Sequence, residues 1–164
     1  MNRRNKKCTT GPHREAIGED HPCPPTAPLC PPGPCRAKER FEEGKSELRE
    51  NNYREAEKLF GLAMYYDSQV PVYHFYQGLA MLGRDAYEDA ECAFERAYAL
   101  EPENADYAAE LGFVCLKMGS PERALFFFRD ALRSEPNHGM ATEGMRRLNP
   151  KKALPQHKKN RSAG

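Results

Sequence analysis

The residues with the most distinctive chemistry are four cysteines near the start of the chain, Cys8, Cys23, Cys30 and Cys35. Four thiolates can hold zinc in a tetrahedral structural site. The spacing argues against a standard site, because six residues separate Cys23 from Cys30, four separate Cys30 from Cys35, and no pair has the CxxC form. A metal- or redox-responsive role through these cysteines is therefore an alternative and not the leading interpretation.

The sequence shows no arrangement that is typical of an enzyme. It has no glycine-rich phosphate loop, no nucleophile elbow and no HExxH zinc motif. Only one of its five histidines, His74, falls inside an expected helix, where a single histidine is more often a packing residue than a catalytic one. We therefore predict a noncatalytic protein without a cofactor.

Charge is distributed unevenly along the chain. Residues 37–148 have a net charge of −7, whereas the preceding residues carry +3 and the following residues +5. Basic ends can contact nucleic acid, but such tails are usually solvated, and the acidic body argues against a nucleic-acid partner.

The sequence also bears on location. No stretch approaches the roughly 20 apolar residues that a membrane span needs, and the basic N-terminal segment lacks the apolar core of a secretory signal. We expect a cytoplasmic protein that is not membrane-bound and whose thiols stay reduced.

The chain contains an internal repeat of 34 residues, marked by Phe60, Phe94 and Phe128. The same register aligns small residues, which let two antiparallel helices approach closely, and prolines, which cannot continue a helix. We predict three helix pairs at residues 37–70, 71–104 and 105–138. The aligned small residues and prolines are Gly44, Gly78 and Gly112; Ala56, Ala90 and Ala124; Ala63, Ala97 and Ala131; and Pro102 and Pro136.

This pattern resembles the tetratricopeptide repeat, which has a Leu-Gly pair, then Ala-x3-Phe and a later proline. The third unit matches it best, with Leu111, Gly112, Ala124, Phe128 and Pro136, although no unit carries the early tryptophan of the family. The resemblance implies an all-α superhelix, a solenoid of stacked helix pairs.

The segments outside the three units have their own predictions. Residues 139–148 are predicted to form a helix that caps the stack. Residues 1–36, which are rich in proline and cysteine, and the basic residues 149–164 are predicted to be disordered tails.

Phe126, Phe127 and Phe128 are consecutive, so they cannot all point into one narrow core stripe. Phe128 is the core residue of the repeat, which leaves Phe126 and Phe127 as additional apolar surface. We expect the capping helix to cover part of this cluster. The alternative is that Phe126 and Phe127 form a second patch, for a homodimer or another partner.

In tetratricopeptide repeats the first helices of successive pairs line a groove that usually holds an extended peptide or a helix. The resemblance thus implies a protein-binding module: an adaptor, an assembly factor or a chaperone-like holder. Apolar anchors would supply affinity, and charged residues would orient the partner. The alternative is that the same apolar residues belong to the core. The implied groove residues are Phe41, Lys45, Leu48 and Arg49; Val72, Phe75, Leu79 and Leu82; and Phe113, Leu116 and Lys117.

Two branches of the family give more specific expectations. Three units with an apolar groove are loosely similar to the type III secretion chaperones that hold translocator proteins, which is a second alternative. Heat-shock cochaperones clamp a C-terminal carboxylate with Lys and Asn side chains. Phe41, Phe75 and Ala109 stand where the leading Lys of that clamp would be, so we predict no capture of chaperone tails.

Overall fold

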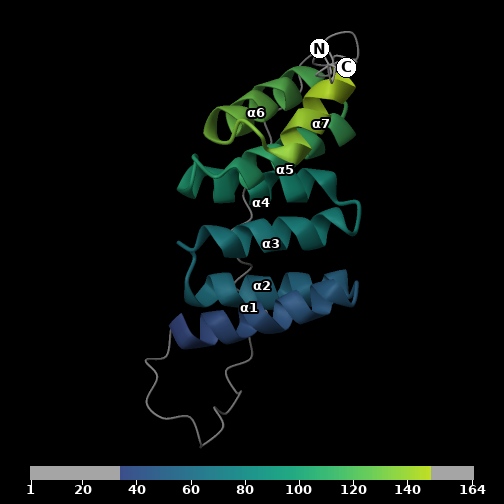
Figure 1. Ribbon diagram of the computed structural model, residues 1–164. Helices are drawn as coiled ribbons and strands as arrows, with labels where there is room; N and C mark the ends of the chain where they lie inside the picture. Colours follow the sequence, from purple (N-terminus) through teal and green to yellow (C-terminus); the bar gives the residue numbers. More distant parts are fainter. Residues whose placement is uncertain (1–33, 149–164) are drawn as a thin grey trace, which may run out of the picture. The chain divides into compact units, whose positions relative to one another are not determined.

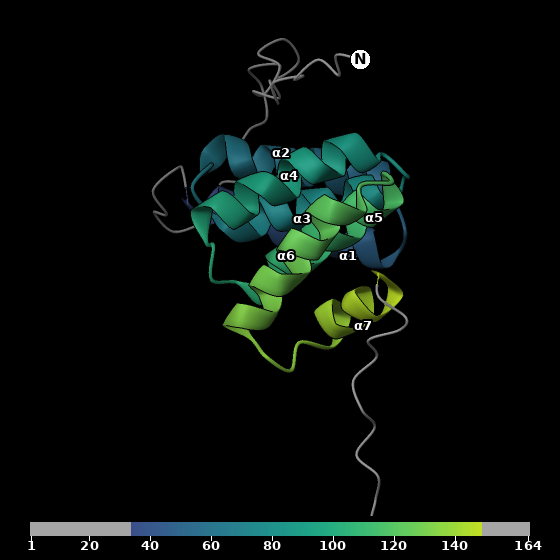
Figure 2. The ribbon, with the colours of Figure 1, turned by 90° about the horizontal axis from the view of Figure 1, so that it is seen from above.

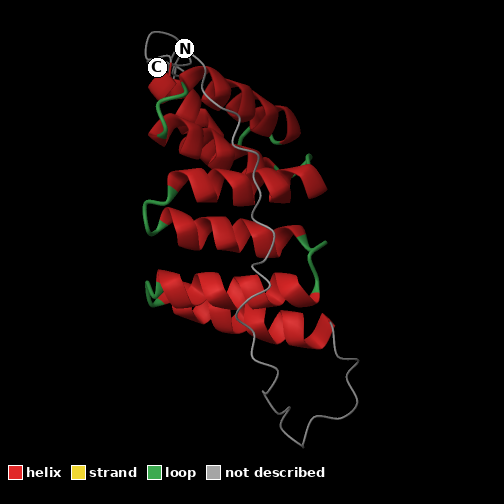
Figure 3. Ribbon diagram, turned by 180° about the vertical axis from the view of Figure 1, so that it is seen from behind, coloured by secondary structure: helices red, strands yellow, loops and turns green. Residues whose placement is uncertain are grey.

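The computed structural model describes residues 34–148, and these residues form helices joined by short connections, with no strand (Figures 1 and 3). The predicted all-α class is confirmed. Among the described residues, no helix combines the length and the apolar character that crossing a bilayer requires. The helices are α1 (Pro34–Arg49), α2 (Tyr53–Tyr66), α3 (Pro71–Leu82), α4 (Tyr87–Leu100), α5 (Ala105–Lys117), α6 (Pro121–Ser134) and α7 (Gly139–Leu148).

The chain divides into two compact units, residues 1–102 with α1 to α4 and residues 103–164 with α5 to α7. In the first unit, α1 packs on α2, α3 packs on α4, and α2 and α1 both contact α3. Small residues make these contacts close. A Cβ atom on Gly44 would lie 2.6 Å from the ring of Phe60, and one on Gly78 would lie 2.7 Å from the ring of Phe94.

The turn inside each helix pair depends on a residue with positive φ. Asn51 (φ 62°) and Asp85 (φ 59°) adopt this conformation in the first unit, and Gly119 (φ 71°) does so in the second. Asn and Asp tolerate the left-handed region better than other side chains. Two residues later, Tyr53 donates a hydrogen bond to Asn51 (2.8 Å) and Tyr87 donates one to Asp85 (2.5 Å), so the tyrosines hold these turns.

In the second unit, α5 packs on α6, and α7 contacts both of them. Figure 2 shows how α7 follows α6 through a short connection. The bounds of α7 agree with the predicted helix 139–148. Phe128 is completely buried and Phe127 is buried, but Phe126 is 61% exposed. The expectation that a last helix covers part of the phenylalanine cluster is therefore met at Phe128, where Gly144 of α7 faces the ring.

The cysteines differ from the expectation in one respect. Cys35 and Cys92 are disulfide-bonded, so the expectation of reduced thiols is wrong at these two positions. A sulfur in a disulfide is not available to a metal ion. Cys8, Cys23 and Cys30 lie outside the described residues, as do the predicted tails apart from residues 34–36, so these predictions stay predictions.

Candidate partner-binding surface

The floor of the candidate site in the first unit is a cluster of aromatic rings. Phe41 of α1 is only 8% exposed. Its ring centre lies 4.9 Å from that of Tyr73, 5.1 Å from that of Tyr76 and 5.8 Å from that of Phe60. Phe41 was predicted to line the groove, but it is buried in the core, because α3 supplies two rings that cover it.

Above this floor, Lys45 lies one helical turn after Phe41. Its ammonium group is 5.0 Å from the centre of the Phe41 ring and 2.8 Å from a carboxylate oxygen of Glu42. A cation over an aromatic face is attracted by the ring quadrupole. Both contacts restrict the Lys45 side chain, so the charge has a defined place on the surface of α1.

Apolar side chains surround this charge. Leu48 of α1 and Val72 of α3 pack against the core but remain half-buried. Phe75 is also half-buried, with its ring centre 5.5 Å from that of Phe94. Because α1 contacts α3, we treat the predicted groove residues of these two helices as one candidate surface, which we call the α1/α3 surface. Its predicted members, apart from Phe41, are Lys45, Leu48, Arg49, Val72, Phe75, Leu79 and Leu82, all half-buried except the exposed Arg49.

Sequence reasoning missed one residue of this surface, Tyr76. Its half-buried ring makes an edge-on contact with Phe41 (5.1 Å, 89°) and lies 5.8 Å from Phe75. The signal that could have found it is its position on the helix. Tyr76 lies four residues after Val72 and three before Leu79, so it belongs to the same helical stripe.

The predicted groove residues of the second unit lie on α5. Phe113 and Leu116 are half-buried and Lys117 is exposed. The ring of Phe113 packs edge-on against Phe128 (5.3 Å, 77°), and the guanidinium of Arg147 in α7 lies 5.6 Å from the centre of the Phe113 ring. Phe113 is thus partly covered by α7.

The start of α5 is acidic. Asp106 accepts a hydrogen bond from Nε2 of His138 (3.0 Å), while Nδ1 of His138 accepts one from the backbone N–H of Ala141 (3.2 Å). These two partners indicate the tautomer with the proton on Nε2. Burial raises the pKa of the Glu110 carboxyl, the charge of Asp106 adds to this, and His138 opposes it.

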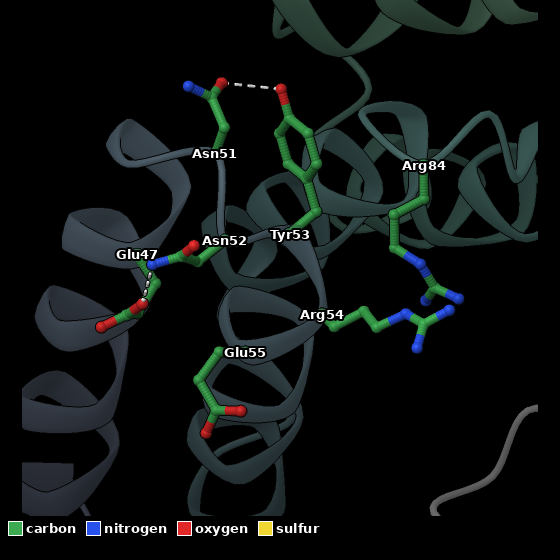
Figure 4. A pocket seen from close by; sticks show the side chains of 7 residues that line it. All are labelled: Glu47, Asn51, Asn52, Tyr53, Arg54, Glu55 and Arg84. Carbon is green, nitrogen blue, oxygen red and sulfur yellow. Dashed lines mark hydrogen bonds between the residues drawn. The ribbon is translucent and has the colours of Figure 1, made fainter.

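A separate open hollow of about 590 Å³ lies beside the turn between α1 and α2 (Figure 4). Most of its polar side chains already pair: Asn52 donates to Glu47 (2.9 Å), Tyr53 donates to Asn51 (2.8 Å), and Arg84 forms an ion pair with Glu57. None of the predicted groove residues lines it. Its lining residues are Glu47, Asn51, Asn52, Tyr53, Arg54, Glu55 and Arg84.

Comparisons with known proteins agree with this fold. Residues 81–144 match the family model of the tetratricopeptide repeat. The tetratricopeptide domain of Arabidopsis OM64 is similar, with 19% identity and a TM-score of 0.68 over 70% of this chain and 95% of that chain. The first such domain of Spaghetti (RPAP3), bound to the HSP90 peptide SRMEEVD, has 22% identity and a TM-score of 0.69 over 71% of this chain and 93% of that chain. The second tetratricopeptide domain of human RPAP3, in complex with the HSP70 peptide SGPTIEEVD, has 21% identity and a TM-score of 0.68 over 71% of this chain and 98% of that chain.

A comparison with curated proteins gives no match. The likeness to the solved structures shows the fold. The described residues form three helix pairs followed by a last helix, a fold similar to that of these tetratricopeptide domains. The family match itself extends over residues 81–144.

Proposed function

We propose that the chain is a noncatalytic protein-binding module that holds an apolar segment of a partner on the α1/α3 surface. The observation that supports this most directly is the row of half-buried apolar side chains on a floor of packed rings. Leu48, Val72 and Tyr76 are held from below by the core, so binding would cost little ordering of these side chains. Such preorganisation favours affinity.

The charges of this surface indicate which kind of partner segment it would attract. Lys45 is fixed over Phe41, and Arg49 follows it by one turn at the exposed end of α1. Both would attract acidic groups that flank the apolar segment, which mainly affects association rate and orientation. On α5, Leu116 and Lys117 are proposed to make a second set of contacts, which is tested separately.

The expected partner differs from the chaperone peptides bound by the two RPAP3 domains. The positions of the leading clamp lysine hold Phe41, Phe75 and Ala109, of which Phe41 and Ala109 are buried. The acidic Asp106 side chain, 71% exposed on α5, would repel a peptide such as SRMEEVD. We therefore propose an apolar internal segment as the ligand, and binding of labelled SRMEEVD or SGPTIEEVD would contradict that choice.

The experiment is affinity capture from the native host with three variants. Leu79→Glu places a charge on the α1/α3 surface, Leu116→Glu tests α5, and Lys58→Glu on the exposed side of α2 is the control. Circular dichroism must show that all three remain helical. Loss of one captured protein with Leu79→Glu but not with Lys58→Glu supports the proposal. Unchanged capture by a folded Leu79→Glu variant contradicts it.

The identity of the captured partner also decides between the specific roles. A translocator protein would support the role of a type III secretion-like chaperone, which otherwise stays a prediction.

A further inference from the structure

Helix α6 leaves one large aromatic side chain exposed to solvent, that of Phe126. The equivalent positions in the earlier helix pairs hold Lys58 and Cys92. Its ring stands edge-on against the buried Phe127, with the ring centres 5.3 Å apart at 76°. This contact holds the ring in a defined orientation at the surface.

Phe126 belongs to a straight row of exposed side chains, Glu122, Phe126, Arg129 and Arg133, which we call the α6 stripe. The spacings of four, three and four residues place these side chains on one line along a helix. Arg133 is fixed at one end of the stripe by its ion pair with the buried Asp130.

The side chains of the α6 stripe are complementary to those of a second α6 stripe that runs in the opposite direction. If two α6 helices pair antiparallel about an axis midway between Phe126 and Arg129, Glu122 of one copy faces Arg133 of the other. Phe126 of each copy then faces Arg129 of the other. The first contact joins opposite charges, and the second places a guanidinium over an aromatic ring. Parallel pairing would instead place arginine opposite arginine.

We propose that two copies of this chain associate through the α6 stripe in this antiparallel arrangement. A two-fold axis gives each contact twice, because the same patch serves both copies. The order of charges along the α6 stripe favours a second copy as the occupant, because Glu122 and Arg133 of one copy face Arg133 and Glu122 of the other. This surface is distinct from the α1/α3 surface.

The small size of the stripe determines the strength of the association. Helix α6 has 14 residues, about 21 Å at 1.5 Å per residue. One helix pair of this length buries less than the roughly 1,000 Å² expected of a stable interface. The dimer is therefore weak and reversible, and salt weakens it because its ion pairs are exposed.

The test is sedimentation equilibrium of the full chain over a range of concentrations, with nonreducing electrophoresis to exclude disulfide-linked dimers. Wild type should show a reversible dimer. Phe126→Arg places arginines opposite each other and should lower the association constant about tenfold or more. The double variant with Phe126→Arg and Arg129→Phe has the same amino-acid composition as wild type. It should recover the dimer, because each arginine again faces a phenylalanine.

Three results would overturn the proposal. The first is a wild-type chain that stays monomeric at the highest soluble concentration. This result would overturn the proposal even if the monomer bound a different protein through Phe126. The second is a dimer that Phe126→Arg leaves unchanged, since it would use another surface. The third is a folded double exchange that stays monomeric, because the antiparallel arrangement requires recovery.

Discussion

Gly112 of α5 lies directly against the ring of Phe128 in α6: a Cβ atom on Gly112 would lie 2.5 Å from Cε1 of Phe128. Gly144 of α7 faces the same ring from another helix. The Phe128 ring is completely buried, so it cannot move away from one glycine without approaching the rest of the core. The repeat thus needs glycine here because a ring fills the space of a side chain.

The first prediction follows from this contact. Gly112→Ala should lower the free energy of unfolding by about 1–3 kcal/mol, because overpacking a rigid buried ring forces side chains or backbone to shift. Urea unfolding followed by circular dichroism measures the change.

Gly61→Ala in α2 is the matched control. A Cβ atom at this position meets nothing within 4 Å, so the substitution should raise the free energy of unfolding by about 0.5–1 kcal/mol through helix propensity alone. If both alanine variants were stabilised, close packing on Phe128 would not be the reason for Gly112.

A second prediction concerns His74, which is buried and whose Nε2 lies 2.9 Å from the carbonyl oxygen of Ser68. Burial lowers the pKa of His74, the charge of Arg96 adds to this, and the bond to Ser68 opposes both. Below the ordinary pKa of about 6.5 the unfolded chain takes up a proton that the folded chain does not. Stability should therefore fall as the pH drops below that value, by up to about 1.4 kcal/mol per pH unit.

The measurement is urea unfolding between pH 7 and pH 5 for wild type and His74→Gln. Glutamine keeps a side-chain donor but does not titrate, so the difference between the two proteins isolates His74 from other titrating groups. The variant should lose less stability than wild type over this range. An identical pH dependence in both proteins would show that His74 is not the responsible group.

A third prediction compares two glutamates of the second unit. Burial raises the pKa of Glu110, with a further contribution from Asp106. The folded chain therefore holds this proton more tightly than the unfolded chain, and its stability falls as the pH rises above about 4.5. Glu110→Gln should raise the free energy of unfolding at pH 7, and the gain should shrink toward pH 4.

Glu143 should show the opposite behaviour. Hydrogen bonds from Arg146 and then Arg147 lower its pKa to about 2. This stabilisation is present above pH 4.5 and is lost as the pH falls toward 2, so Glu143→Gln should lower the free energy of unfolding at pH 7. If the two glutamine variants changed stability in the same direction, local electrostatics would not explain either.

The sequence predicted the helix pairs because their close contacts recur with the chain's own period. Gly44 against Phe60, Gly78 against Phe94 and Gly112 against Phe128 are each separated by 16 residues. The existence of α7 was also predictable, because a stack of helix pairs needs a last helix to cover its final apolar face.

The sequence could not predict which apolar residues stay exposed. Phe41 and Leu48 belong to the same predicted groove, yet Phe41 is buried and Leu48 is not. The difference arises because Tyr73 and Tyr76 of the next helix pair cover Phe41, and a position within one repeat does not reveal its neighbour's side chains.

His138 shows the same limit. In the sequence it stands alone at the end of the third repeat, and its acidic partner Asp106 is 32 residues earlier. The structure gives it a second role, because Nδ1 accepts a hydrogen bond from the N–H of Ala141, two residues after the first residue of α7. His138 is therefore the N-cap of α7 as well as its link to α5.

The last prediction separates these two roles. His138→Ala removes both, and should lower the free energy of unfolding by about 0.5–2 kcal/mol, the usual range for loss of an N-cap. Hydrogen exchange should show the loss first at the amides of α7. His138→Asn restores a short acceptor for the Ala141 N–H, so it should recover most of the protection in α7. If the asparagine variant exchanged as fast as the alanine variant, the link to Asp106, and not the cap, would be what keeps α7 in place.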